Sequence, residues 1–117
     1  MSVENTVTLL AGGDIGPLYE PGDQLAELIL PTLRQADLRF GQCERTFSEK
    51  HGGPPGSSCL KPPVACIWKT TGIDVISLAS NHTMDGGPEA LLETMALFRG
   101  MGKQMVFTNR AWVSVDL

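Results

Sequence analysis

The segment Ile76–Gly87 constrains the fold of this chain more than any other. It opens as an apolar strand and then passes through Asn81, His82 and Asp85 before two glycines. A helical pattern begins directly afterwards, at Pro88. A strand that leads through a loop into a helix is the building unit of α/β folds, and open α/β sheets bind ligands beyond the carboxyl ends of their strands. The segment therefore predicts an α/β fold with a polar site at that edge of the sheet.

The other apolar segments repeat this alternation. We expect strands at Thr6–Ala11, Ala36–Gly41, Ile73–Leu78 and Gln104–Phe107. We expect helices at Asp23–Leu33, where Pro31 should kink or shorten the helix, at Val64–Thr71 and at Pro88–Arg99. The segment Thr46–Pro63 is rich in Pro, Gly and Ser and predicts a long loop. Strands separated by helices are typical of a mostly parallel sheet, here expected to be covered on both faces.

Composition excludes several kinds of partner. The chain has 117 residues and a formal net charge of −4, with no run of Lys or Arg, which argues against nucleic acid as a partner.

Its three cysteines, Cys43, Cys59 and Cys66, form no Cys-x-x-Cys pair and predict reduced thiols rather than disulfides or a zinc knuckle. No secretory signal and no membrane-spanning apolar run is visible, so we expect a cytoplasmic chain as written.

Polar side chains follow three of the expected strands. Asp14 follows the first, Gln42 and Glu44 the second, and Asn81 and His82 the third. Because the carboxyl ends of parallel strands share one edge, we expect Asp14, Glu44, Asn81 and His82 to line one pocket. Carboxylate and amide oxygens with an imidazole are ligands for a divalent metal ion, and a histidine can also protonate a leaving group.

Each candidate also has a structural alternative. Asp14 can be a turn residue, and Glu44 can form a solvated ion pair with its arginine neighbour. Asn81 and Asp85 can form Asx turns before the helix. His82 can be a hydrogen-bonded core histidine. The sequence context favours the site interpretation for Asp14 and His82, and both interpretations of Glu44 stay open.

The motifs resemble those of the CapA family, the poly-gamma-glutamate capsule biosynthesis proteins related to calcineurin-like metallophosphoesterases. The resemblance covers about residues 6–104 and is carried by Gly13–Ile15, Ala36–Glu44 and Ser77–Gly87. It implies a metallophosphoesterase-like layered sheet covered by helices, with a metal-dependent hydrolase site for a phosphoester or an amide. The implied substrate is a small molecule or a polymer.

The resemblance also implies a role for each candidate residue. Asp14, Glu44 and Asn81 would be ligands of Mn²⁺, Mg²⁺, Fe²⁺ or Zn²⁺, and Asn81 could instead orient a phosphate. His82 would be the general acid, and Asp85 would orient its ring by a hydrogen bond.

The chain departs from the family pattern in two respects. Gln42 and Cys43 stand where members usually have Asn and Leu before the glutamate. Members are also more than twice as long and carry a later His-Trp-Gly motif that this sequence lacks, so residues 1–117 are expected to be a single, incomplete CapA-like domain. We therefore expect the metal to be bound weakly. The alternatives to catalysis are a non-catalytic binding or assembly role and an inactive truncated product. An incompletely covered sheet also predicts self-association. Family members are often membrane-anchored or exported.

Overall fold

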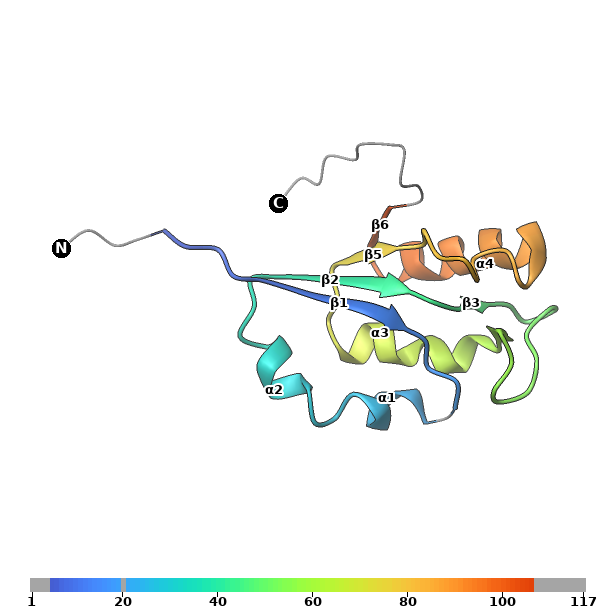
Figure 1. The fold of residues 1–117 in the computed structure, drawn as a ribbon, viewed down its shortest axis with the longest axis horizontal. Coiled ribbons are helices and arrows are strands. Elements are labelled where there is room, and N and C mark those ends of the chain that lie inside the picture. Colours follow the sequence, from blue (N-terminus) through green and yellow to red (C-terminus); the bar gives the residue numbers. More distant parts are fainter. Residues whose placement is uncertain (1–4, 20, 107–117) are drawn as a thin grey trace.

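The computed structural model describes residues 5–19 and 21–106, which contain a four-stranded parallel sheet flanked by helices (Figure 1). The strands lie in the order β1-β2-β5-β6, with bounds β1 Leu9–Ile15, β2 Leu38–Cys43, β5 Val75–Ser77 and β6 Gln104–Val106. Each strand pairs in parallel with its neighbour. The predicted α/β fold with a parallel sheet is confirmed; Phe107, expected at the end of the last strand, lies outside the described residues.

Strand β1 begins and ends later than the sequence pattern indicates. The expected strand ended at Ala11 before a turn, but Gly12, Gly13 and Asp14 lie within β1. Its register against β2 shifts between Gly12 and Ile15, and Asp14 has a φ of 50°. An aspartate tolerates this left-handed conformation better than most residues, so the irregularity is accommodated within the strand.

The helix expected at Asp23–Leu33 is two short helices, α1 (Gly22–Leu25) and α2 (Leu30–Leu33). Pro31 lies in the first turn of α2, where its missing N–H breaks no helical hydrogen bond. The second helix therefore starts at the proline instead of continuing the first. The apolar face expected of one long helix is largely open to solvent, with Leu28 97% exposed.

The segment expected to be a long loop contains a second, two-stranded parallel sheet of β3 (Thr46–Phe47) and β4 (Cys59–Leu60). A 3-10 turn, η1 (Pro62–Ala65), then leads into α3 (Cys66–Thr70), where a short helix was predicted. Helix α4 (Gly87–Gly100) begins and ends one residue outside its predicted bounds. On α4, the buried Thr94 accepts a hydrogen bond of 2.8 Å from the main-chain N–H of Phe47, which fixes β3 against the helix.

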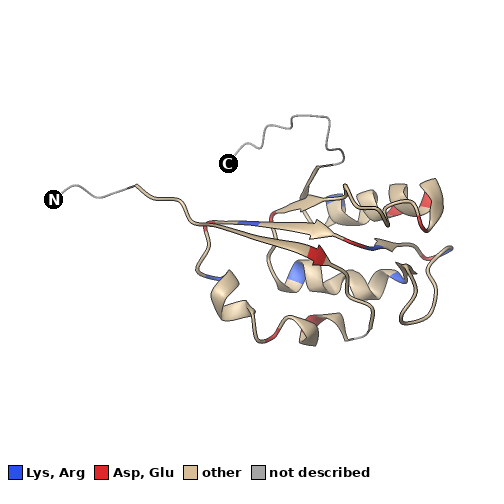
Figure 2. Cartoon of the chain, in the orientation of Figure 1, with Lys and Arg blue, Asp and Glu red and all other residues tan. Residues whose placement is uncertain are grey.

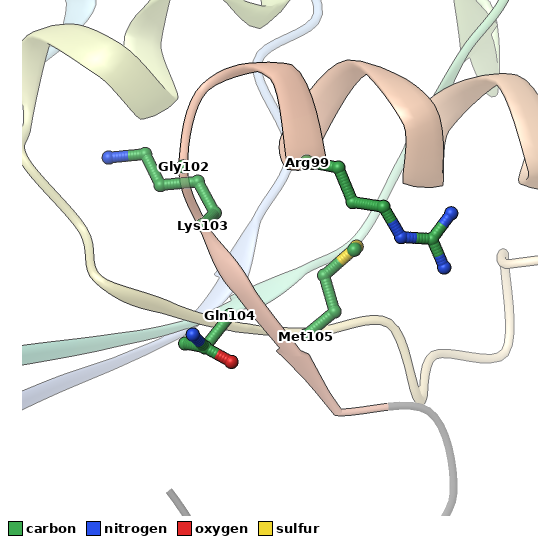
Figure 3. A pocket seen from close by; sticks show the side chains of 5 residues that line it. All are labelled: Arg99, Gly102, Lys103, Gln104 and Met105. Carbon is green, nitrogen blue, oxygen red and sulfur yellow. The ribbon is translucent and has the colours of Figure 1, made fainter. Parts of the chain in front are cut away.

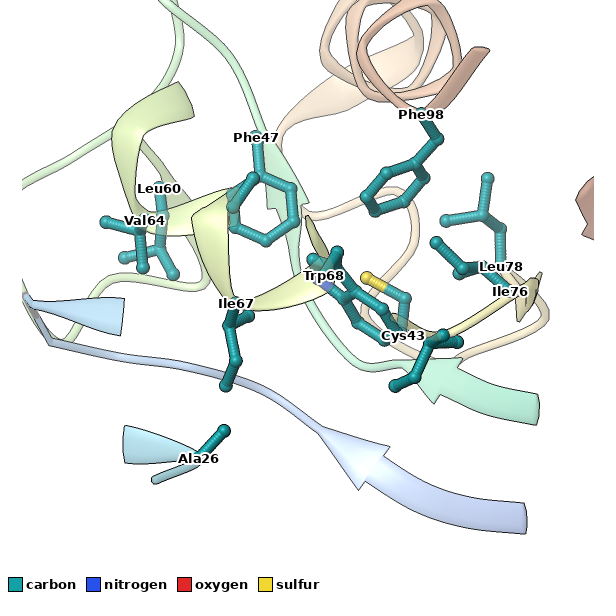
Figure 4. Close-up of a cluster of buried hydrophobic side chains, with 12 residues drawn as sticks. Ala26, Cys43, Phe47, Leu60, Val64, Ile67, Trp68, Ile76, Leu78 and Phe98 are labelled. Atoms are coloured by element: carbon teal, nitrogen blue, oxygen red, sulfur yellow. The ribbon is translucent and has the colours of Figure 1, made fainter. Parts of the chain in front are cut away.

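The core is centred on three fully buried aromatic side chains (Figure 4). Trp68 of α3 packs edge-to-face on Phe98 of α4 with ring centroids 5.5 Å apart, and Phe98 packs in the same way on Phe47 at 6.1 Å. Gly41 of β2 faces this cluster, because an added Cβ there would lie 2.9 Å from the Trp68 ring. Trp68 is thus a core residue that lies against the sheet.

The helices that connect the main strands lie on one face of the sheet. Strands that follow one another in chain order, joined by right-handed crossovers, place every connecting helix on the same side. The contact between Trp68 of α3 and Phe98 of α4 agrees with this arrangement. The strand order never reverses, which favours helical cover of one face, and cover of the second face stays a prediction. None of the helices in the described ranges is long and apolar enough to cross a membrane.

Candidate active site

The candidate site lies at the carboxyl ends of β1, β2 and β5. Figure 2 shows acidic positions at the tip of β1 and just beyond the tip of β2, where a basic position follows. Side chains alternate between the two faces of a strand, and Gly41 faces the core, so Gln42 faces the side of the sheet away from the helices. The site therefore opens away from the helical layer.

Gln42 joins the ends of β1 and β2. Its Oε1 accepts a hydrogen bond of 2.7 Å from the main-chain N–H of Asp14, and its Nε2 donates to Glu44 Oε2 at 2.9 Å. Asp14 lies within the register shift of β1. In the sequence, Gln42 was placed at the end of its strand but was not included among the candidate site residues. An amide directly before Glu44 at a strand end was the signal that could have included it.

Glu44 lies at the centre of the polar cluster, with its side chain 15% exposed. Its Oε2 also accepts a hydrogen bond of 3.0 Å from the Ser80 hydroxyl, and its Oε1 lies 3.6 Å from His82 Nε2. The hydrogen bond from Gln42, the hydroxyl of Ser80 and the charges of His82 and Arg45 hold the pKa of Glu44 below its ordinary value, against the opposing effect of burial. Glu44 is therefore ionised at neutral pH.

The ring of His82 lies between two carboxylates. Its Nδ1 is 2.5 Å from Asp85 Oδ2, and its Nε2 is on the side of Glu44. The hydrogen bond with His82 is the largest cause that lowers the pKa of Asp85, and the Ser58 hydroxyl and the Arg45 charge add to it. A carboxylate at Nδ1 favours the proton on that nitrogen and leaves Nε2 for a reacting group. The predicted partnership of His82 and Asp85 is present in the structure.

The turn that carries His82 is held by local hydrogen bonds. The Ser80 hydroxyl accepts the main-chain N–H of His82 at 3.1 Å, and Thr83 Oγ1 accepts the N–H of Ser80 at 3.1 Å and donates to the Leu78 carbonyl. Asn81 is exposed, and its side chain makes no hydrogen bond to the described residues. The turn thus directs His82 and Ser80, but not Asn81, toward Glu44.

A divalent ion would need more donors than the described residues bring together. Across residues 5–19 and 21–106, no group of three His, Cys, Asp or Glu side chains is placed to hold a metal ion. Glu44 and His82 are neighbours. Asp14 is linked to Glu44 only indirectly, because its main-chain N–H binds Gln42, which in turn binds Glu44. Divalent ions take about four to six ligands, so the described residues supply only part of a ligand set, and we derive no chemical step through a metal.

Two other features near the strands are unsuited to catalysis. Cys43, at the end of β2, is buried, and burial raises the pKa of its thiol to about 12, so it is not a nucleophile at neutral pH. A hollow of about 460 Å³ lies at the opposite edge of the sheet, between the end of α4 and the start of β6 (Figure 3). Its two cationic side chains, Arg99 and Lys103, point away from each other (Figure 3), so they form no common anion site.

Fold and site together define an α/β protein with an acid–imidazole cluster at the carboxyl edge of a parallel sheet. Residues 8–106 match the family model described as bacterial capsule synthesis protein PGA_cap, and the chain belongs to this family. The match contains all four main strands and the whole cluster, and it confirms the CapA resemblance. No curated protein matches the chain significantly.

Proposed function

We propose that this chain is a capsule synthesis protein with a hydrolase site, in which His82 transfers a proton during cleavage of a phosphoester or an amide. The observation that carries the proposal is the position of the His82 ring, with Nδ1 against Asp85 and Nε2 on the side of Glu44. Membership of the capsule synthesis family supports the biological setting.

The arrangement suits a general acid. Glu44 and Asp85 both have pKa values below their ordinary values, so a negative charge lies on each side of the His82 ring. Asp85 holds the ring orientation through Nδ1, and the proton on Nε2 is the one available to a leaving oxygen or nitrogen. General acid catalysis of this kind contributes about 10² to 10⁴ in rate.

Metal binding by Asp14, Glu44 and Asn81 is a separate part of the proposal. We expect weak binding of Mn²⁺ or Mg²⁺, because Glu44 already accepts hydrogen bonds from Gln42 and Ser80 and few further donors are near. Titration calorimetry on the unsubstituted chain and on Asp14→Ala and Glu44→Gln measures this directly. Unchanged affinity in both variants would place the metal elsewhere.

The alternative function is non-catalytic binding or assembly in capsule synthesis. It is favoured by the lack of a three-ligand group among the described residues. Under this alternative the same polar edge holds a substrate or polymer without cleaving it. Binding of a substrate with no turnover, unchanged by His82→Ala, would select this function.

The test of the hydrolase proposal is activity on two substrate classes. Phosphodiesterase and γ-glutamyl amidase assays are run with and without Mn²⁺ on the unsubstituted chain, Asp14→Ala and His82→Ala. His51→Ala is the matched control, because His51 pairs with Glu89 on α4 and makes no hydrogen bond to His82, Asp85 or Glu44. We expect weak turnover, and His82→Ala should largely remove it for substrates with a basic leaving group, whereas His51→Ala should leave it intact. Undiminished turnover of such a substrate in His82→Ala would contradict the proposed role.

A further inference from the structure

We propose that Arg45 binds an anionic oxygen of the substrate, a carboxylate or a phosphate next to the bond that is cleaved. This inference rests on the proposed function, because it concerns the same site, and it names the substrate class as anionic.

The fold places Arg45 at the edge of the cluster. The main-chain N–H of Glu44 donates to the Ile15 carbonyl at 3.0 Å, which holds this segment against the end of β1. An added Cβ at Gly16 would lie 3.2 Å from Glu44 Cβ and 3.4 Å from Arg45 Cγ. The glycine thus leaves the space along which the stem of Arg45 lies, next to the Cβ of Glu44.

The guanidinium group of Arg45 has no partner among the described residues. Its Nε is buried without a hydrogen bond, and no carboxylate in the described ranges forms an ion pair with it. Arg39 shows the contrast: it donates to the carbonyls of Leu33 and Ala36 and to Asp74. Buried polar groups are normally satisfied, so the unpartnered guanidinium group would gain hydrogen bonds from an acceptor that reaches its other nitrogens, and Arg45 as a whole is only partly buried.

The charges around Arg45 indicate that the acceptor it binds is an anion. Glu44 and Asp85 make the site negative, and an anionic substrate would be repelled from His82 unless a cation offset them. The charge of Arg45 is felt at both carboxylates, whose pKa values it helps to lower. A guanidinium fork can bind two oxygens of a carboxylate or phosphate at once. A neutral substrate would not need this cation.

The test is direct anion binding, which does not depend on turnover. Inorganic phosphate and glutarate are titrated separately at low ionic strength into the unsubstituted chain, Arg45→Gln and Lys69→Gln, with binding followed by NMR. Lys69→Gln is the charge-matched control, because Lys69 is exposed on α3 and lies outside the cluster. We expect Arg45→Gln to weaken binding of at least one anion by about tenfold or more, and Lys69→Gln to leave it nearly unchanged.

Comparison of the two anions shows whether the substrate group bound by Arg45 is a phosphate or a carboxylate. Preference for phosphate indicates a phosphorylated substrate, and preference for glutarate indicates a carboxylated one. No binding of either anion, or equal loss in both variants, overturns the role of Arg45. If Arg45→Gln does not fold, Arg45→Lys replaces it: we expect binding to weaken because lysine lacks the fork, and undiminished binding overturns the proposal. Hydrolysis tests the role of His82, and anion binding tests the role of Arg45. Loss of hydrolysis in His82→Ala with anion binding intact would therefore support both roles independently.

Discussion

The main-chain N–H of Asp14 donates a hydrogen bond of 2.7 Å to the side-chain Oε1 of Gln42. This bond joins the irregular end of β1 to the end of β2. The same amide donates to Glu44, which contacts His82 in turn. One glutamine therefore connects the strand ends to the charged cluster, and its removal should alter the electrostatics of the site.

Gln42→Leu is expected to raise the pKa of Glu44 toward its ordinary value, because the hydrogen bond from Gln42 is the largest cause that lowers it. The measurement is a pH titration of the Glu44 carboxyl carbon by NMR. Gln35→Leu is the control, since Gln35 is exposed and lies before β2. A Glu44 titration that is identical in Gln42→Leu and the unsubstituted chain would show that the amide does not act on the carboxylate.

Thr94→Val should destabilise the fold by about 1 to 3 kcal/mol, because it leaves the buried N–H of Phe47 without an acceptor while keeping the side-chain shape. Chemical denaturation measures the free energy of unfolding. Thr94→Ser keeps the hydroxyl and should retain the hydrogen bond, losing only a methyl group. A valine variant as stable as the unsubstituted chain would refute the importance of this contact.

Glu93 makes the stability of the fold depend on pH. Its carboxylate accepts hydrogen bonds from the main-chain N–H of Glu49 and the hydroxyl of Ser48, which hold its pKa below the ordinary value. The stabilisation is present above the pKa of the unfolded chain and is lost as the pH falls through the lower pKa of the folded state. Glu93→Gln should therefore lower stability at pH 7 and flatten its acid dependence in denaturant melts. Glu27→Gln, at an exposed position, should change neither.

Much of the sheet could be predicted because short, largely apolar segments alternate with helical patterns along the chain, which is typical of parallel α/β sheets. The segments around Leu38 and Ile76 pair as expected, and the helix after Gly87 has a clear apolar period. The boundaries of β1 could not be predicted, because its carboxyl half consists of two glycines and Asp14. A Gly-Gly-Asp sequence favours a turn locally, and only pairing with β2 extends the strand through it.

The site was predicted in its chemistry more than in its geometry. Sequence alone placed His82 and Asp85 three residues apart in one loop, and a turn of this length brings them together. The contact of Glu44 with Ser80 and the bridge through Gln42 depend on strand register, which no local pattern contains. The position of Asn81 likewise depends on the turn held by Thr83.

Self-association is expected from the surface of the described residues. Strand β1 is at the edge of the main sheet, and Leu9 in β1 and Leu28 beside α1 are 56% and 97% exposed. We expect light scattering with size-exclusion chromatography to show oligomers, and the double variant Leu9→Lys, Leu28→Lys to reduce them. A monodisperse monomer with a sharp, cooperative melt would contradict this.

The most direct test of the central claim is how the effect of His82→Ala depends on the leaving group. A general acid matters most when the leaving oxygen is strongly basic, so two phosphodiesters are compared, one with a nitrophenolate and one with an alkoxide leaving group. If His82, held by Asp85, donates the proton, His82→Ala should slow cleavage of the alkyl ester by about 10² or more and slow the nitrophenyl ester much less. An equal loss for both esters, or no loss for either, would contradict the assignment of His82 as the proton donor.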